Sequence, residues 1–256
     1  MAAACAGVSK SYAAASGRAV ALADLDLTVP CGRVTGIVGP SGSGKSSLLR
    51  LLAAVDRPDA GSVLVGGEEV SRLRVLARRR LRARLVSYVF QRPTDNLFAE
   101  LTVRQHLDLA ARLRGTRVGE ADLAGLELLG LAGRADHRPE QLSGGEQQRV
   151  AFAAAVVGAP ALVVADEPTA ELDSVSAAAL VEALHDLCRR GTSVVVASHD
   201  PIVIGAATRS CGWTAGGGCD PGGGDGLAGR GAGGLRPRPG ARASPWGGGG
   251  ASPGRR

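Results

Sequence analysis

One stretch of nine residues decides the fold of this chain: Gly39-Pro40-Ser41-Gly42-Ser43-Gly44-Lys45-Ser46-Ser47. It matches the pattern Gly-x-x-x-x-Gly-Lys-Ser/Thr and lies between an apolar segment at 33–38, which predicts a strand, and a helical segment at 46–55. The glycines let main-chain N–H groups surround phosphate oxygens, and the start of the helix adds the positive end of its dipole. We therefore expect a phosphate-binding loop in which Lys45 contacts the terminal phosphates and the Ser46 hydroxyl binds Mg²⁺.

The segments around this loop predict an α/β fold. Three segments are apolar almost throughout, at residues 85–90, 161–165 and 193–197. Helical spacing is found at residues 73–85, 101–131, 146–157 and 174–190. Continuously apolar strands separated by helices are typical of a parallel sheet that is covered on both faces. Turn residues between positions 20 and 38 predict further short strands before the loop.

The apolar segment at 161–165 ends in two adjacent acids, Asp166 and Glu167. Carboxylates at the end of a buried strand are costly unless they have a partner or a role. Downstream of a phosphate-binding loop, Asp166 fits a Mg²⁺ ligand, and Glu167 fits the group that orients and deprotonates the attacking water. Taken alone, the two acids could also simply open a turn before Pro168.

Before that apolar segment, a Ser143-Gly144-Gly145 step comes at the start of the helical segment at 146–157. Its N–H groups, its hydroxyl and the helix dipole could form a second anion site. The same residues also fit an ordinary helix start, in which Ser143 caps the helix and Glu146 completes a capping box. These residues alone leave both interpretations open.

The three motifs, which follow one another along the chain at 39–47, 143–145 and 166–167, resemble the ATP-binding cassette (ABC) family from residue 8 to about residue 204. The resemblance implies a P-loop NTPase ABC cassette: an α/β fold with a mostly parallel sheet core, an antiparallel β subdomain and a helical subdomain inserted at about 95–150. It also implies ATP hydrolysis with Mg²⁺ in a head-to-tail dimer, in which Ser143 and Gly145 contact the γ-phosphate held by the other cassette. The partner cassette could be a second copy or a different chain.

Several further roles come from the resemblance alone. It assigns Gln91 to Mg²⁺ and the attacking water, His199 to the γ-phosphate, and Tyr12 to stacking on adenine, while Asp173 matches the aspartate that couples the two sites. The catalytic residues implied are Lys45, Gln91, Glu167 and His199, and the metal ligands implied are Ser46, Gln91 and Asp166. The ATP-binding residues implied are Tyr12, Gly39, Pro40, Ser41, Gly42, Ser43, Gly44, Lys45, Ser46, Ser47, Gln91, Ser143, Gly144, Gly145, Asp166 and His199.

Residues 78–91, 96–98 and 101–103 are similar to the lipoprotein-release and macrolide-export branch of that family. This similarity implies an ATPase subunit that drives a separate membrane permease, which docks near Gln91 to Glu100. It places the protein in the cytoplasm, on the inner face of the cell membrane. The alternatives are an ATP-binding regulatory or degenerate cassette with little turnover, and the ATPase of a mechanotransmission complex that is not a transporter.

Charge and composition set the expected domain limits. The formal charge is +6, but after residue 212 six arginines face two aspartates, so the rest of the chain is near neutral and no nucleic-acid partner is expected. An arginine-rich run at 72–84 fits a solvated helix face or a contact with anionic head groups. The five cysteines lack metal-ligand spacing and are expected to be reduced.

We expect the nucleotide-binding domain at residues 1–207 and a Gly-, Arg- and Pro-rich tail at 208–256. The tail has too few large apolar side chains to offset its ordering entropy, which predicts disorder. A shifted reading frame in a G+C-rich gene would produce the same composition. In either case the sheet is expected to lack the strands that the family usually has after His199, which would leave its edge uncovered.

Overall fold

The computed structural model describes residues 1–15, 17–213 and 219–220. The chain divides into two compact units, Met1–Gly224 and Asp225–Arg256, and the second lies outside the described residues. The fold below is that of the first unit.

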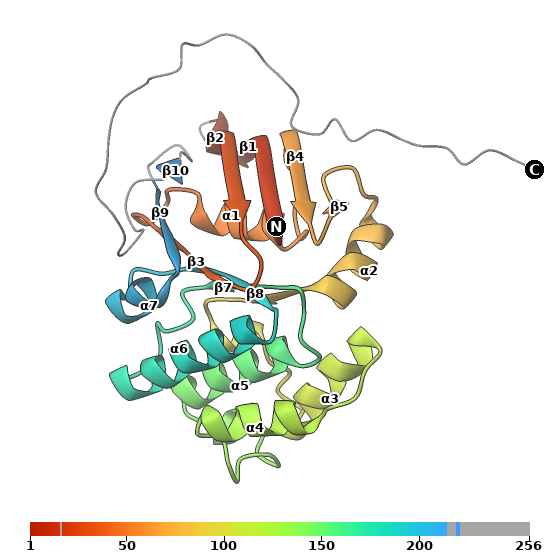
Figure 1. The fold of residues 1–256 in the computed structure, drawn as a ribbon, viewed down its shortest axis with the longest axis vertical. Coiled ribbons are helices and arrows are strands. Elements are labelled where there is room, and N and C mark those ends of the chain that lie inside the picture. Colours follow the sequence, from red (N-terminus) through yellow and green to blue (C-terminus); the bar gives the residue numbers. More distant parts are fainter. Residues whose placement is uncertain (16, 214–218, 221–256) are drawn as a thin grey trace, which may run out of the picture. The chain divides into compact units, whose positions relative to one another are not determined.

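An antiparallel sheet forms one layer of the fold (Figure 1). Its strands are β1 (Ala3–Ala14), β2 (Gly17–Val29), β4 (Ala60–Val65) and β5 (Glu68–Glu69), in the order β2-β1-β4-β5. Alternate residues such as Leu25, Leu27 and Val29 are buried while their neighbours are exposed, as expected of a sheet with one face on the core. Sequence analysis predicted strands from residue 20 onward but not β1.

A second, mostly parallel sheet carries the motifs. Within the described residues its order is β10-β9-β3-β8-β7-β6. The strands are β3 (Val34–Val38), β6 (Val86–Val89), β7 (Leu162–Asp166), β8 (Ser193–Ala197), β9 (Arg209–Trp213) and β10 (Cys219–Asp220). Every residue of β7 and β8 is buried, because helices or the other sheet cover both faces. The expected α/β fold class is confirmed.

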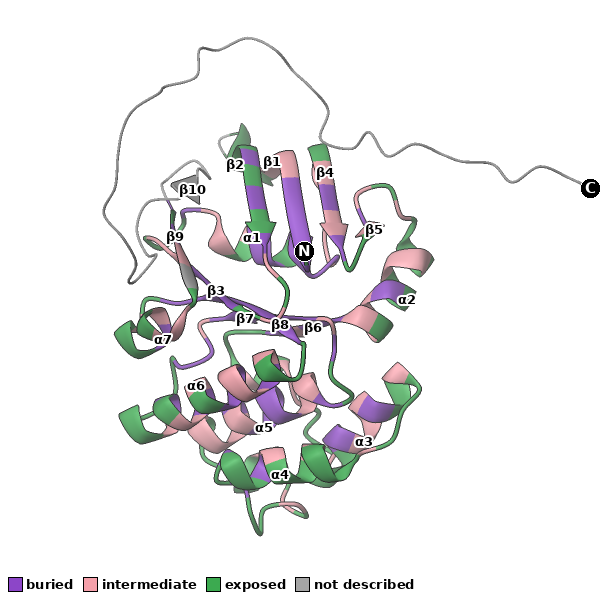
Figure 2. Cartoon of the chain, in the orientation of Figure 1, coloured by how far each residue is buried: buried purple, intermediate pink, exposed green. Residues whose placement is uncertain are grey.

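The helix α1 (Lys45–Leu52) lies between the two sheets. Four of its eight residues are buried leucines, namely Leu48, Leu49, Leu51 and Leu52. They join both sheets into one hydrophobic cluster, which appears as the buried interior in Figure 2. The helix that follows the phosphate-binding loop is therefore fixed from two sides.

Four helices lie on the side of the parallel sheet that faces away from the antiparallel sheet (Figure 1). They are α3 (Val103–Arg114), α4 (Glu120–Leu128), α5 (Gly144–Val156) and α6 (Ser174–Arg189), with short 3₁₀ turns at Pro93–Asp95 and Pro139–Gln141. Helix α4 packs against α5 and α6. Helix α3 begins at a capping box made by Thr102 and Gln105 and ends at Gly115, whose φ of 71° few other residues tolerate. Phe152 of α5 is buried in this second cluster.

The arginine-rich run forms α2 (Val75–Leu85), and part of it has a structural role. Arg78 donates to the carbonyl oxygen of Val55 at 3.3 Å, and Arg82 donates to that of Ala54 at 2.7 Å. These carbonyls follow the carboxyl end of α1, where cations offset the helix dipole. The run is therefore more than a solvated face, although Arg79 and Arg80 are exposed.

The compact unit continues beyond residue 207, where sequence analysis placed the domain boundary. After α7 (Pro201–Ala206), strand β9 pairs in parallel with β3, from Thr35 opposite Arg209 to Val38 opposite Gly212. This strand covers the edge of β3 that was expected to be open. Cys211 and Trp213 are buried in the first cluster, and Cys211 is disulfide-bonded rather than reduced. The predicted disorder or frame shift of the tail also concerns residues 214–218 and 221–256, which lie outside the described part of the chain.

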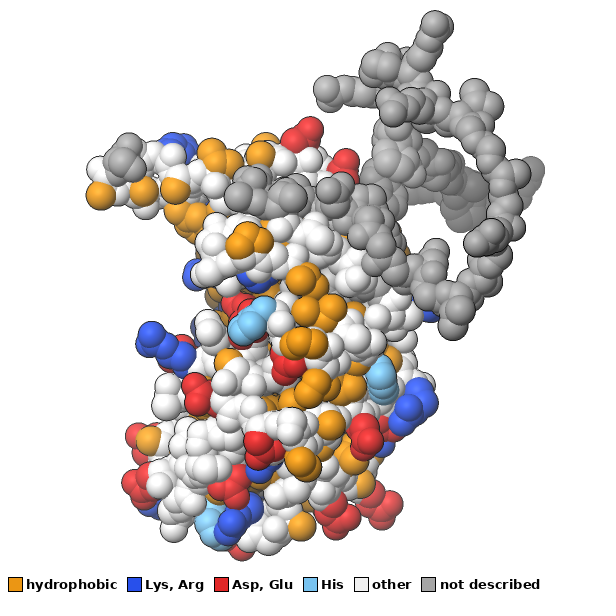
Figure 3. Space-filling view, turned by 90° about the vertical axis from the view of Figure 1, so that its left-hand side faces the viewer, with side chains coloured by type: hydrophobic (Ala, Val, Ile, Leu, Met, Phe, Trp, Pro, Cys, Tyr) orange, Lys and Arg blue, Asp and Glu red, His pale blue; other side chains and the backbone are white. Residues whose placement is uncertain are grey.

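The surface of the described part shows both charged and apolar regions. On the face over α6 and α7, hydrophobic side chains lie among acidic and basic ones (Figure 3). None of the described helices is long and apolar enough to span a bilayer.

Candidate functional site

The phosphate-binding loop connects β3 to α1 and depends on its glycines. Gly42 and Gly44 have φ values of 77° and 99°, in the left-handed region that favours glycine. A Cβ on Gly44 would lie 2.2 Å from the carbonyl oxygen of Ala21 in β2. A side chain at this position would therefore push the loop away from the antiparallel sheet.

The side chains of the loop fold back onto its main chain. Lys45 Nζ donates to the carbonyl oxygens of Gly39 at 2.7 Å and Pro40 at 2.8 Å. Ser43 is buried, and its hydroxyl donates to the Pro40 oxygen at 2.7 Å. The ammonium group thus already lies across the mouth of the loop, where an incoming phosphate could replace the two carbonyl oxygens.

Asp166 lies at the carboxyl end of β7 beside Ser46, and these two residues fit a Mg²⁺ site. Burial raises the pKa of the Asp166 carboxyl above its usual value, and the Ser46 hydroxyl opposes that shift by hydrogen bonding. A cation would compensate the buried charge. No cluster of three or more His, Cys, Asp or Glu side chains among the described residues could hold a metal ion. Phosphate oxygens and water would supply the remaining ligands, as Mg²⁺ prefers.

Glu167 follows in an unusual backbone conformation. Its φ is 46°, which is uncommon for a residue with a side chain, and its N–H donates to the Ala197 oxygen at 2.8 Å. Glu167 Oε2 lies 3.0 Å from His199 Nδ1 and accepts a hydrogen bond from the His199 N–H at 3.3 Å. This carboxylate raises the pKa of His199, through the hydrogen bond first and then through its charge.

A cavity of about 510 Å³ brings most of the predicted residues together. It lies at the carboxyl ends of β3, β7 and β8, where ligands of open α/β sheets bind. Its lining comprises Ala21, Gly39, Pro40, Ser41, Gly42, Gly44, Lys45, Ser46, Ser47, Gln91, Asp166, Glu167 and His199. Gln91 reaches it from the segment after β6.

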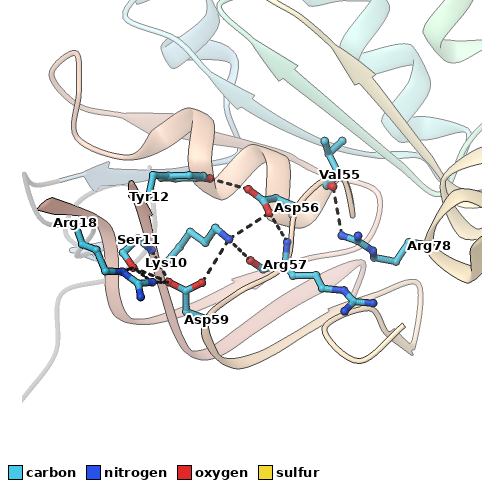
Figure 4. Close-up of polar contacts among 9 residues, drawn as sticks. All are labelled: Lys10, Ser11, Tyr12, Arg18, Val55, Asp56, Arg57, Asp59 and Arg78. Carbon is cyan, nitrogen blue, oxygen red and sulfur yellow. Dashed lines mark hydrogen bonds and ion pairs between the residues drawn. The ribbon is translucent and has the colours of Figure 1, made fainter. Parts of the chain in front are cut away.

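Tyr12 does not line this cavity. Its hydroxyl donates to Asp56 at 3.0 Å, and its ring lies near Lys10, whose Nζ is 5.2 Å from the ring centroid (Figure 4). Lys10 in turn pairs with Asp56 at 3.2 Å and Asp59 at 3.5 Å. These contacts fix the ring on β1, and its stacking on adenine remains a prediction.

Ser143, Gly144 and Gly145 also lie outside the cavity lining. Ser143 begins α5 with a capping box, in which its hydroxyl accepts from the Glu146 N–H at 3.2 Å. Asp173 caps α6 by accepting from the Ser176 N–H at 2.7 Å. The helix-start interpretation therefore describes the geometry within one chain, and the contact with a nucleotide on another chain remains a prediction.

Sequence analysis missed two residues beside the loop. Ala21 lines the cavity and approaches Gly44 through its main chain. Trp213 lies against the loop from outside the cavity: its indole N–H donates to the Ser43 oxygen at 2.6 Å. Neither residue type signals nucleotide binding, so the sequence held no local pattern that could have found them.

Comparisons with known proteins identify a family for the chain. The model of the ABC transporter family matches residues 22–170. The lipoprotein-releasing system ATP-binding protein LolD 2 of Caulobacter vibrioides is 40% identical over 198 residues, which cover 76% of this chain and 86% of that protein. The macrolide export ATP-binding/permease protein MacB 1/2 of Paracoccus denitrificans is 40% identical over 208 residues, 79% of this chain. The chain spans only 30% of that longer relative.

Solved structures give the same result. A dimeric post-hydrolysis state of the ATP-binding cassette MJ0796 bound to ADP and Pi is similar with a TM-score of 0.78 and 30% identity, covering 85% of this chain and 96% of that one. Another dimeric structure of MJ0796, a bacterial ABC transporter cassette, matches with the same TM-score and 31% identity. The chain belongs to the ABC transporter family, as an ATP-binding cassette of the branch that contains LolD and MacB.

Proposed function

We propose that this chain is the ATP-hydrolysing subunit of an ABC transporter and drives a separate membrane permease. One observation carries the proposal. A phosphate-binding lysine, two acids, a glutamine and a histidine line one cavity beside a glycine-rich loop, namely Lys45, Asp166, Glu167, Gln91 and His199. This is the set of groups that phosphoryl transfer to water requires.

Each group has a distinct task in hydrolysis. Lys45 leaves the Gly39 and Pro40 oxygens and binds the β- and γ-phosphates, while the loop N–H groups bind the remaining oxygens. Glu167 accepts a proton from the attacking water, and Gln91 and His199 orient that water and the γ-phosphate. Ser46 and Asp166 would hold Mg²⁺, which when bound neutralises part of the phosphate charge.

The active unit in this proposal is a dimer of cassettes. Ser143 and Gly144 are exposed at the start of α5 and do not reach the cavity of their own chain. Two chains arranged head to tail would bring this helix start onto the γ-phosphate of the partner, where N–H groups and the helix dipole favour an anion. ATP binding would then close the dimer.

The permease would dock on a groove next to Gln91. This groove, of about 260 Å³, is lined by apolar residues that include Phe90, Phe98 and Leu113, all of them exposed. Hydrogen bonds hold its loop: the Asn96 side chain bonds to the N–H and carbonyl of Phe90 at 2.8 and 2.9 Å, and His106 Nε2 accepts from the Phe98 N–H at 2.8 Å. A short helix of a membrane protein would bury these side chains and hold the cassette at the inner face of the membrane.

The proposal is tested by phosphate release from purified chain supplied with ATP and Mg²⁺. Lys45→Ala removes the phosphate-binding ammonium and is expected to lower turnover at least about 100-fold. Arg50→Ala, which removes an exposed cation from the same helix away from the cavity, is the matched control and retains turnover. Nucleotide binding by the unmodified chain without phosphate release would instead indicate a regulatory cassette.

A further inference from the structure

Trp213 holds the phosphate-binding loop from the side that faces away from the cavity. The side chain is 3% exposed and packs in the same hydrophobic cluster as α1. Its indole N–H donates to the main-chain oxygen of Ser43 at 2.6 Å. A buried donor and a buried acceptor are thereby both satisfied, and loss of either would leave the other unpaired.

The same residue also contacts the first position of the loop. Pairing of β9 with β3 sets Gly212 opposite Val38, so Trp213 lies beside Gly39. A Cβ on Gly39 would lie 2.5 Å from the Trp213 oxygen and 2.7 Å from its Cβ, so a side chain is excluded there. Trp213 therefore contacts the loop both where it begins and just before α1.

These contacts differ from those within the loop itself. The bonds from Lys45 to Gly39 and Pro40 use the group that must bind phosphate, so they are lost when a nucleotide enters. The Trp213 bond does not compete with phosphate, because neither Trp213 nor Ser43 lines the cavity. It can persist in the occupied state and hold the loop N–H groups in position.

We propose that Trp213 is a positioning residue for nucleotide binding: it keeps the phosphate-binding loop in the shape that accepts phosphates and links strand β9 to ATP affinity. This inference rests on the proposed role of the loop. It assigns no catalytic step to Trp213, so its loss should weaken nucleotide binding more than it slows hydrolysis.

The first test uses Trp213 itself as the probe. The chain has two tryptophans, so Trp246→Phe leaves Trp213 as the sole indole emitter. Addition of ADP with Mg²⁺ is expected to leave the emission maximum at that of a buried indole, because the bond to Ser43 persists, while calorimetry reports binding. Adding Lys45→Ala to this variant should abolish the calorimetric signal. A red shift of the emission on binding contradicts the inference, whereas absence of binding contradicts the proposed function.

The second test removes the hydrogen bond. Trp213→Phe keeps an aromatic ring and is expected to raise the KM for ATP about three- to ten-fold while kcat changes less than about two-fold. Val203→Ala is the control, because Val203 is buried in the other cluster, so the variant loses stability without touching the loop. If Val203→Ala raises KM as much as Trp213→Phe, or if neither changes KM, Trp213 does not position the loop. If Trp213→Phe does not fold, the emission of Trp213 in the ADP-bound chain still tests the inference.

Discussion

Glu167 Oε2 lies 3.0 Å from His199 Nδ1, so the expected base and the expected γ-phosphate contact form a pair. Glu167 is 13% exposed and His199 is 80% exposed. The histidine side chain therefore has open space around it, and a turn toward a phosphate would leave the more buried Glu167 in place. Separation of this pair would free the carboxylate for the attacking water.

The Glu167–His199 pair predicts how the pKa of His199 depends on Glu167. Because the carboxylate favours the imidazolium, the pKa of His199 is raised, and the ion pair is present below the ordinary histidine pKa and lost as pH rises through the raised value. Glu167→Gln is expected to return the pKa of His199 toward its usual range, as followed by NMR of the imidazole C–H. Glu171→Gln, an exposed acid in the same loop, is the control. Equal His199 titration in the unmodified chain and in Glu167→Gln would exclude the pair.

The two capping boxes separate a structural role from a functional one. Ser143 begins α5 and Thr102 begins α3 with the same geometry. Each alanine variant is expected to cost about 0.5–2 kcal/mol in the free energy of unfolding, measured by urea titration. Only Ser143→Ala should also weaken ATP-dependent dimerisation, because its hydroxyl would face the partner's nucleotide. Equal loss of dimer in both variants would mean that Ser143 is only a cap.

If the permease docks in the groove, a charged side chain placed there should weaken binding of the chain to membranes. Phe98 is 56% exposed. Membranes are prepared from cells of the source organism that no longer make this chain, and the purified chain is sedimented with them. Phe98→Asp is expected to lower the amount that sediments by about ten-fold or more. Leu123→Asp, on α4 outside the groove, should sediment like the unmodified chain. Both variants should keep the ATPase activity of the isolated cassette. Unchanged sedimentation of Phe98→Asp would place the permease elsewhere.

Strand β9 predicts where the chain can be shortened. Ending the chain at residue 208 removes Cys211 and Trp213 from the core and exposes the edge of β3, at a cost of about 3–5 kcal/mol for the lost indole alone. Ending it at Asp220 keeps the strand and should leave the melting temperature unchanged. Thermal unfolding of the two shortened chains checks this, and equal melting would show that β9 contributes nothing.

Local pattern predicted most of the parallel sheet. Strands β7 and β8 are continuously apolar and bounded by turn residues, and the phosphate-binding loop identified the strand and helix beside it. The residues that line the cavity could be named because each lies in a short motif at the end of a strand. Their roles depended on the family resemblance.

Long-range strand pairing explains why sequence analysis missed strands β1 and β9. Strand β1 begins Ala3-Ala4-Cys5, which has weak strand propensity, and it is stabilised by pairing with β2 and β4. Strand β9 contains Arg209, Ser210 and Gly212, which gave no apolar run, and it forms by pairing with β3, far away in the sequence. Trp213 supports the loop only because of that pairing.

The most direct measurement is the mass of Glu167→Gln in solution with ATP and Mg²⁺, by light scattering after size exclusion. The variant lacks the general base, so hydrolysis should fall by a factor of about 100 or more while ATP stays bound. We expect a stable dimer with two ATP molecules that reverts to a monomer when nucleotide is removed. A variant that binds ATP but stays monomeric at every concentration would contradict a site shared between two cassettes.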